Sequence, residues 1–225
     1  MVSPVASQPV HQILDREDVV LRVLTRSDVA DIPIAPAEVI ELVRGAYLRV
    51  ADGISVAPAK IMMRSPHRDS AAYAMPGYDG GSHITAFKDY YMQNDEGKKE
   101  YITITLYDDE AGLPIAFMDC FRVTALRTAA NTALIAGACA PAVARSALVT
   151  GSGAQARYTY SFLLTALPKL DRLMLFATHP DGIASVRAHL REQHPDRDIE
   201  VVTDPEKAAG ASDLLVATSA GPATE

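Results

Sequence analysis

The sequence predicts an α/β protein in which an α+β lobe precedes an incomplete Rossmann-type parallel sheet. The central observation is residues 146–164 (SALVTGSGAQARYTYSFLL), where an apolar run stops at a glycine turn and a helical pattern follows. This order of strand, glycine turn and helix is typical of the βαβ unit that binds dinucleotides. Further apolar runs follow at 172–178, 199–202 and 213–218, at the spacing of successive strands of a parallel sheet. Before the turn, residues 55–121 consist of short runs broken by glycine, proline and aspartate, a texture that favours a mostly antiparallel sheet.

The elements before the glycine turn can be assigned in order. Residues 1–18 are expected to form a loose arm, 19–24 a strand, and 36–53 a helix that Pro36 opens and Gly53 ends. Five strands should follow, at 60–63, 71–75, 83–91, 101–107 and 113–119. Residues 101–107 (YITITLY) alternate, so one face of that strand should be buried and the other polar. A hairpin turn at 108–112 and a long helix at 123–140 complete the first lobe, which we place at 1–140, with the Rossmann lobe at 141–225.

Composition excludes several classes of protein. The net charge of the 225 residues is −7 with mixed signs, which argues against a nucleic-acid surface. No run of about eighteen apolar residues exists, so no membrane-spanning helix is expected. The N-terminus has no basic stretch followed by an apolar core, so it does not resemble a secretion signal. Cys120 and Cys139 lie in apolar surroundings without metal-ligand spacing. We therefore expect a cytoplasmic protein with reduced thiols and no metal site.

The glycine turn has the residues that a pyrophosphate site needs. Gly151 permits a tight turn, Gly153 lets a pyrophosphate approach the backbone, and the small Ala156 lets helix and strand pack closely. Ala154 and Gln155 open the helix, where backbone N–H groups are free to hold an anion. An ordinary tight turn is the alternative interpretation.

Several motifs resemble the ornithine cyclodeaminase and μ-crystallin family. They are FMDCFRVTALRTAANTALIAG, which leads into ALVTGSGAQAR, and upstream AYAMPGYDGG followed by ITAFKDYY. The resemblance covers roughly residues 20–219 and implies a substrate-binding and dimerisation lobe joined to an NAD(P)-binding Rossmann lobe. It further implies a homodimer that uses NAD or NADP at a carbon bearing an amino or imino group. The family includes cyclodeaminases, alanine dehydrogenases, ketimine reductases and opine-type dehydrogenases, whereas μ-crystallin is known largely as a binding protein.

The resemblance implies three substrate-binding residues. Arg127 matches the family arginine that clamps the substrate carboxylate, a task that suits the guanidinium fork. Lys88 lies in an otherwise apolar strand, where its ammonium needs a partner such as a substrate carboxylate or carbonyl, and we expect it to be catalytic. Lys60 stands where many members carry an arginine, as in opine dehydrogenases of diaminopropionate pathways, and Arg64 is a candidate for the missing guanidinium. A helix-surface arginine and a sheet-edge lysine are the alternatives for Arg127 and Lys88.

Other residues are expected near the cofactor. Thr128 and Asn131 lie on the long helix near the glycine turn, and Thr218 ends the fourth Rossmann strand. At the tip of the second strand, where a carboxylate would hold the adenosine ribose, the chain has His179. This histidine could contact the ribose or simply be solvated, Asp181 is expected to start a helix, and the choice between NAD and NADP stays open.

The family's general acid/base is an aspartate that follows the fourth Rossmann strand, beyond which this sequence has only a few residues. Asp204 and Asp213 do not match its motif. Two functions are therefore expected. One is an NAD(P)-dependent oxidoreductase or cyclodeaminase that acts on an amino or imino acid. The other is a truncated, catalytically impaired relative that binds the cofactor, either a fragment or a natural short form.

Overall fold

The computed structural model describes residues 20–30, 32–95 and 97–218, which form two compact units. The first unit contains residues 20–30 and 52–120, and the second contains 32–51 and 121–218. The predicted loose arm at 1–18 lies outside the described residues.

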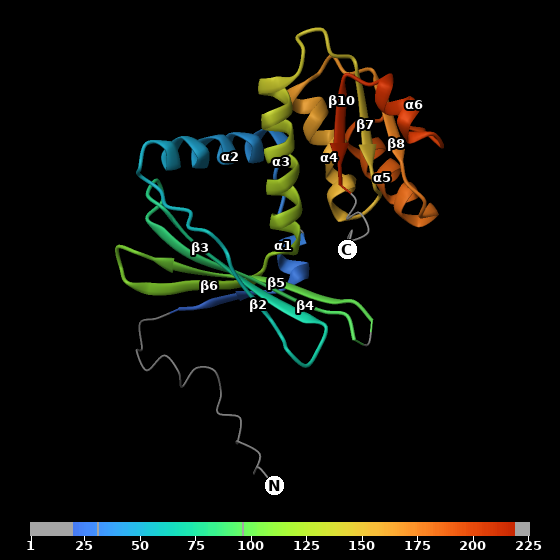
Figure 1. Cartoon of the computed structure of the whole chain (residues 1–225). Helices are drawn as coiled ribbons and strands as arrows, with labels where there is room; N and C mark the ends of the chain where they lie inside the picture. The colour runs from blue at the N-terminus through green and yellow to red at the C-terminus, as the bar shows by residue number, and fades with distance from the viewer. Residues whose placement is uncertain (1–19, 31, 96, 219–225) are drawn as a thin grey trace. The chain divides into compact units, whose positions relative to one another are not determined.

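The first unit is a twisted six-stranded sheet whose longest strands have 10 residues (Figure 1). Its order is β1-β6-β5-β4-β3-β2, and all neighbours are antiparallel except β1 and β6. A short helix, α1 (Arg26–Ala30), packs against β6. The five strands predicted between residues 60 and 119 are all present, as is the strand predicted before residue 25. Their bounds are β1 (Arg22–Leu24), β2 (Ile61–Arg64), β3 (Ser70–Asp79), β4 (Ile84–Gln93), β5 (Lys99–Asp108) and β6 (Leu113–Asp119).

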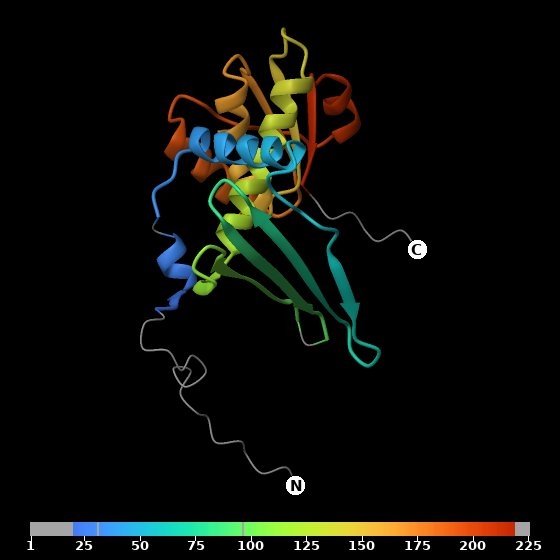
Figure 2. The same cartoon turned by 90° about the vertical axis from the view of Figure 1, so that its left-hand side faces the viewer.

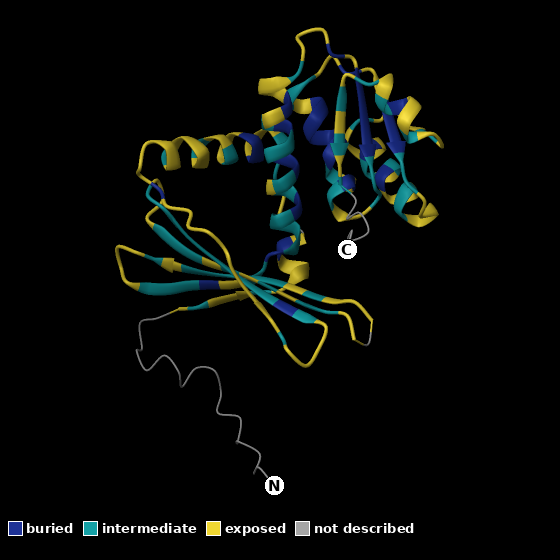
Figure 3. Ribbon diagram, in the orientation of Figure 1, coloured by how far each residue is buried: buried dark blue, intermediate teal, exposed yellow. Residues whose placement is uncertain are grey.

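This sheet is only thinly covered within its own unit (Figure 3). Among its described strand residues only Ala71 and Ala116 are buried. The alternation of burial predicted for β5 is not observed, because residues 102–106 are all half-buried, the threonines as well as Ile102, Ile104 and Leu106. Within the described residues of this unit, the helix that packs on the sheet is only five residues long.

The second unit contains a parallel sheet with strand order β10-β7-β8-β9, which confirms the predicted Rossmann-type fold. Alternate side chains of the central strands face opposite ways. Ala147 and Val149 pack against α4 and α5, whereas Leu148 and Met174 pack against Ala208 of α6. Helices therefore cover both faces. The bounds are β7 (Ser146–Thr150), α4 (Ala154–Ala166), β8 (Arg172–Phe176), α5 (Pro180–Gln193), β9 (Glu200–Val201), α6 (Pro205–Gly210) and β10 (Leu214–Ala217).

Two helices from before the glycine turn belong to this second unit. They are α2 (Pro36–Ala51) and α3 (Phe121–Cys139), which cross each other (Figures 1 and 2). Ala129, Ala130 and Ala133 of α3 are small enough for α2 and Phe162 of α4 to pack closely on them. The compact units consequently divide at 120/121, and 32–51 joins the second, which differs from the division at 140/141 expected from sequence. No helix of the described residues is both long and apolar enough to cross a membrane.

Candidate functional site

The glycine turn between β7 and α4 adopts the backbone that the sequence predicted. Gly151 has φ of 97°, a left-handed conformation that favours glycine, and its N–H donates to the Phe176 carbonyl at 2.8 Å. Ala156 is fully buried, so α4 lies close to the sheet. A Cβ built on Gly153 would meet nothing within 4 Å. The space in front of this residue is therefore open to a ligand.

The first turn of α4 offers backbone donors to that space. Its N-cap residue is Gly153, and no side chain caps the helix. The first N–H groups of a helix precede its hydrogen-bond ladder, and the helix dipole adds partial positive charge there. The N–H groups that begin with Ala154 and Gln155 can therefore bind an anion such as a pyrophosphate.

A cavity of about 230 Å³ brings together three of the residues predicted to touch the cofactor, Thr128, Gln155 and Thr218. The side-chain Oε1 of Gln155 is buried and has no hydrogen-bond partner among the described residues. Its other lining residues come from α3, α4 and β10 and were not predicted: Ala129, Thr132, Thr159, Val216 and Ala217. The threonines had a signal in the sequence, since 128/132 and 155/159 are polar pairs four residues apart on their helices.

The polar groups of this cavity are mainly hydrogen-bond acceptors. The hydroxyl of Thr128 donates to the Thr124 carbonyl at 2.7 Å, and that of Thr218 donates to the Thr150 carbonyl at 2.7 Å. Each hydroxyl has used its proton within the protein but keeps acceptor lone pairs. These two hydroxyls suit a ligand that donates, such as a carboxamide or a ribose hydroxyl.

The start of α5 lies against the glycine turn. A Cβ built on Gly182 would lie 2.4 Å from Ser152 Oγ and 2.8 Å from the Ser152 carbonyl oxygen. The sequence analysis missed this pair, although a glycine in the first turn of a helix was a possible signal. His179 is the N-cap of α5, is exposed and makes no side-chain capping bond, and Asp181 lies in the first turn as expected. His179 is not among the residues that line the cavity.

Lys88 and Lys60 lie on the same face of the first unit's sheet. Lys88 pairs with Met75, and Tyr90, two residues further along β4, pairs with Tyr73. The Lys60 ammonium lies over the Tyr73 ring, 5.2 Å from its centroid. We call this the lysine face, defined by Lys60, Tyr73, Met75, Lys88 and Tyr90. Both predicted substrate-binding lysines of this unit are therefore neighbours across β3.

Arg64 is on the lysine face as well, because it pairs with Ala71. It lies four residues from Lys60, about 13 Å along an extended strand at roughly 3.3 Å per residue. Its role as a substitute guanidinium remains a prediction.

A hydrogen-bonded ion pair supports the aromatic part of the lysine face. Tyr90 donates to Glu100 at 2.8 Å, and Lys98 lies 2.7 Å from the same carboxylate. Burial, together with the bond to Glu100, raises the pKa of Tyr90 to about 12. Burial opposes ionisation of Glu100, but the bonds from Lys98 and Tyr90 outweigh it and lower the pKa of that carboxyl.

Arg127 belongs to the second unit, on α3, where its side chain is exposed. Within the described ranges, its guanidinium has no hydrogen-bond or ion-pair partner, so the alternative of an arginine paired with an aspartate is not realised there. Asn131 instead accepts a hydrogen bond from Tyr47 of α2 at 2.7 Å, so that contact ties α3 to α2.

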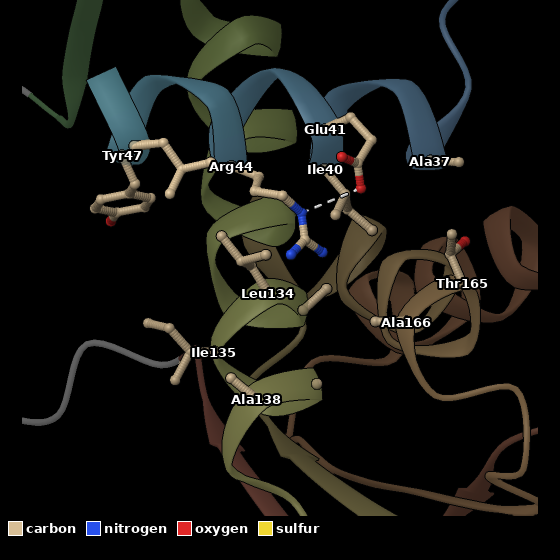
Figure 4. A pocket seen from close by; sticks show the side chains of 13 residues that line it. Ala37, Ile40, Glu41, Arg44, Tyr47, Leu134, Ile135, Ala138, Thr165 and Ala166 are labelled. Atoms are coloured by element: carbon tan, nitrogen blue, oxygen red, sulfur yellow. Dashed lines mark hydrogen bonds and ion pairs between the residues drawn. The ribbon is translucent and has the colours of Figure 1, made fainter. Parts of the chain in front are cut away.

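A larger groove of about 830 Å³ lies among α2, α3 and α4 (Figure 4). Its lining is mostly apolar, with Arg44 bonded to Glu41 at 3.3 Å. None of the residues predicted to bind substrate or cofactor lines it. Over the described part of the chain, no group of three or more His, Cys, Asp or Glu residues could hold a metal ion.

Comparisons with known proteins agree with this architecture. Ornithine cyclodeaminase of Agrobacterium fabrum is 28% identical over 158 residues, which are 69% of this chain and 44% of that protein. Nodulation efficiency protein NfeD of Rhizobium meliloti is 30% identical over 155 residues, 67% of this chain and 48% of that protein. The chain thus matches about half the length of these relatives.

Solved structures show the same fold. Δ(1)-pyrroline-2-carboxylate reductase of Thermococcus litoralis, solved with NADH and L-proline, superposes with a TM-score of 0.76 at 24% identity, covering 87% of this chain and 61% of its own. Iminosuccinate reductase of Paracoccus denitrificans, solved with NAD+, has a TM-score of 0.76 at 18% identity, with 88% and 62% covered. The model of the ornithine cyclodeaminase/mu-crystallin family matches residues 19–224. The chain therefore belongs to this family.

Proposed function

We propose that the chain binds NAD or NADP and acts as an oxidoreductase or cyclodeaminase on an amino or imino acid. The observation that carries the proposal is the cavity beside the glycine turn, where Thr128, Gln155 and Thr218 meet. An acceptor-rich cavity next to an uncapped helix N-terminus fits a ligand with one anionic group and one hydrogen-bond donating group. A dinucleotide has both, and the relatives solved with NADH and NAD+ share this fold.

The residues of the second unit would hold the cofactor. The N–H groups of Ala154 and Gln155 would bind the pyrophosphate, and Gly153 would let it approach. Thr128, Gln155 and Thr218 would accept hydrogen bonds from the nicotinamide half. The bound cofactor supplies a hydride acceptor or donor for the substrate carbon that bears nitrogen. His179 at the tip of β8 would contact the adenosine side of NAD or NADP.

The residues of the first unit would bind the substrate. Lys60 and Lys88 present two ammonium groups on one face, where they attract a carboxylate. Lys88 would also polarise the substrate carbonyl or imine, which is its catalytic role. Arg127, a residue of the second unit, is proposed as the bidentate ligand of the carboxylate. Fixing the carboxylate orients the α-carbon, and such positioning contributes much of the rate in reactions between two bound molecules.

The assembly is proposed to be a homodimer. The sheet face opposite the lysine face carries exposed apolar side chains at Ile61, Met63, Phe87, Tyr91, Tyr101 and Phe117. Asp89 is exposed on the same face, between Phe87 and Tyr91. Exposed apolar side chains grouped in this way are typical of a surface that another protein covers. The free thiol of the exposed Cys139 favours a reducing compartment, so we place the protein in the cytoplasm.

NADH binding, followed by its fluorescence and by thermal shift, tests the proposal. Gly153→Asp should abolish binding, because it puts a carboxylate into the pyrophosphate space. Gly210→Asp is the matched control, since a Cβ at Gly210 also meets nothing within 4 Å. Gln155→Met should weaken binding without lowering the stability of the free protein, because it removes a buried carbonyl that has no partner. Equal binding by Gly153→Asp and the parent would place the cofactor elsewhere.

A further inference from the structure

The lysine face is organised in rows that run across the strands. Lys88 pairs with Met75 on one side and with Ile104 on the other. Lys60 lies two residues before Met62, which pairs with Tyr73, so it extends the row of Met75 and Lys88. The Cα atoms of the two lysines are therefore about 10 Å apart, the width of two strand spacings. A carboxylate bound above Met75 would be within reach of both flexible ammonium groups.

One side of this row is an aromatic wall. Tyr73 and Tyr90 stack with ring centroids 5.5 Å apart and an interplanar angle of 26°. Tyr73 also lies beneath the Lys60 ammonium, a cation–π contact that draws the ammonium toward the ring. Tyr90 is in turn fixed by its bond to Glu100. The wall therefore positions Lys60 and presents an uncharged surface beside the bound carboxylate.

The other side of the row has the smallest residues of the face. Gly77 pairs with Ala86, and both lie two residues from the row of Met75 and Lys88. A substrate side chain that leaves the carboxylate in either direction along the strands thus meets an uncharged surface. On one side it meets the tyrosine rings, and on the other it meets Gly77 and Ala86.

The three carboxylates among the strand residues of this face are already bonded, including Glu100, which lies at the end of the aromatic wall. Glu100 is held by Tyr90 and Lys98, Asp79 accepts hydrogen bonds from Ser55 and Ser82, and Asp108 accepts from the N–H groups of its own turn. Glu100 pairs with Met92, and Asp108 and Asp79 pair with Ile84. Met92 and Ile84 are each four residues from Lys88 along β4, so the backbones of these rows are about 13 Å from that of Lys88.

We propose that the lysine face selects amino or imino acids whose side chain carries no positive charge, and that Tyr73 is the residue that determines this specificity. The inference rests on the proposed function, in which Lys60 and Lys88 hold the substrate carboxylate. The terminal ammonium of a diamino acid would approach two lysine ammonium groups and meet tyrosine, glycine and alanine, while Glu100 beside the tyrosine wall is already paired with Lys98. Charge repulsion opposes such binding, and so does the cost of desolvating an ammonium that gains no partner. The preference would distinguish the chain from relatives named for ornithine.

Calorimetric titration with ornithine and norleucine tests the proposal. These two amino acids have side chains of the same length that end in an ammonium and a methyl group, respectively. NADH is present at saturation, so that the bound amino acid is not oxidised. The parent chain should bind norleucine at least about tenfold more tightly than ornithine. Tyr73→Phe keeps the ring and should keep the preference. Tyr73→Leu should weaken norleucine binding because Lys60 loses its support, and Tyr73→Glu should move the preference toward ornithine by about tenfold or more.

The outcomes separate the two proposals. Equal or tighter binding of ornithine by the parent would overturn the specificity proposal while leaving amino-acid binding intact. An unchanged preference in a folded Tyr73→Glu variant, verified by circular dichroism, would exclude Tyr73 as its determinant. No heat with either amino acid, despite NADH binding, would contradict the substrate part of the proposed function, and the specificity proposal with it.

Discussion

Gly182 at the start of α5 lies so close to Ser152 of the glycine turn that a Cβ at position 182 would be 2.4 Å from the Ser152 hydroxyl oxygen. The turn is also tied to β8 by the bond from the Gly151 N–H to the Phe176 carbonyl. The first and second strands of the parallel sheet thus meet at the proposed pyrophosphate site, and the shape of the turn depends on α5 as well as on its own glycines.

Replacement of Gly182 by alanine should therefore disturb the turn. Ser152 would have to shift, and overpacking of this kind typically costs about 1–3 kcal/mol in the free energy of unfolding. NADH affinity should fall as well, because part of this cost arises only when the turn takes the shape that binds the cofactor. A part of about 1.4 kcal/mol would lower the affinity tenfold. Urea unfolding and NADH titration measure the two effects. Gly210→Ala, where a Cβ meets nothing within 4 Å, is the control and should leave NADH affinity unchanged.

The sequence predicts elements well where the signal is local. The turn around Gly151 and Gly153 and the strand at 101–107 have short-range patterns, and both have the predicted backbone. Helix α1, which was not predicted, also had a local signal. Thr25 and Asp28 form a reciprocal cap in which the Thr25 N–H donates to the Asp28 carboxylate at 2.7 Å.

Long-range packing was harder to predict. From the sequence, the alanines of α3 could pack in either lobe. Their contacts with Ile40 and Phe162 show that they belong to the second unit. The contact of Gly182 with Ser152 joins residues thirty positions apart, so no local pattern reveals it. In the candidate site, Thr128, Gln155 and Thr218 were found through motifs, whereas Thr132 and Thr159 became visible only as walls of the cavity.

Tyr90 should make the stability of the protein depend on alkaline pH. Burial and the bond to Glu100 raise its folded pKa to about 12, above the usual value of 10.0. A group whose folded pKa is raised stabilises the fold fully below its unfolded pKa, and this stabilisation is lost as the pH rises through the folded value. Between pH 10 and 12, the free energy of unfolding should therefore fall more steeply in the parent than in Tyr90→Phe.

On unfolding between these pH values, the parent should release up to about one proton more than Tyr90→Phe. Chemical denaturation at several pH values measures it. The buried Tyr160, whose pKa burial also raises, contributes equally to both proteins and cancels in the comparison. Tyr101→Phe, at an exposed position on the opposite face, is the control and should follow the parent. Parallel curves for the parent and Tyr90→Phe would mean that the Tyr90 hydroxyl is not held by Glu100.

The apolar face of the first unit should make the chain a dimer. Phe87, on the central strand β4, is 44% exposed and contacts Tyr107 edge-on at 5.9 Å between centroids, so an aromatic patch lies near the middle of this face. A stable pair needs about 800 Å² from each partner, which a six-stranded sheet face can supply. Light scattering at tens of micromolar should therefore give twice the mass of the chain.

Phe87→Asp would bury a charge at the centre of the interface and should weaken association at least about 30-fold, the effect of a 2 kcal/mol hot spot. Leu42→Asp places the same charge at a residue of α2 that is 58% exposed, and it should leave the dimer intact. If the parent is a monomer at this concentration, or if Leu42→Asp dissociates the dimer and Phe87→Asp does not, the sheet face is not the interface.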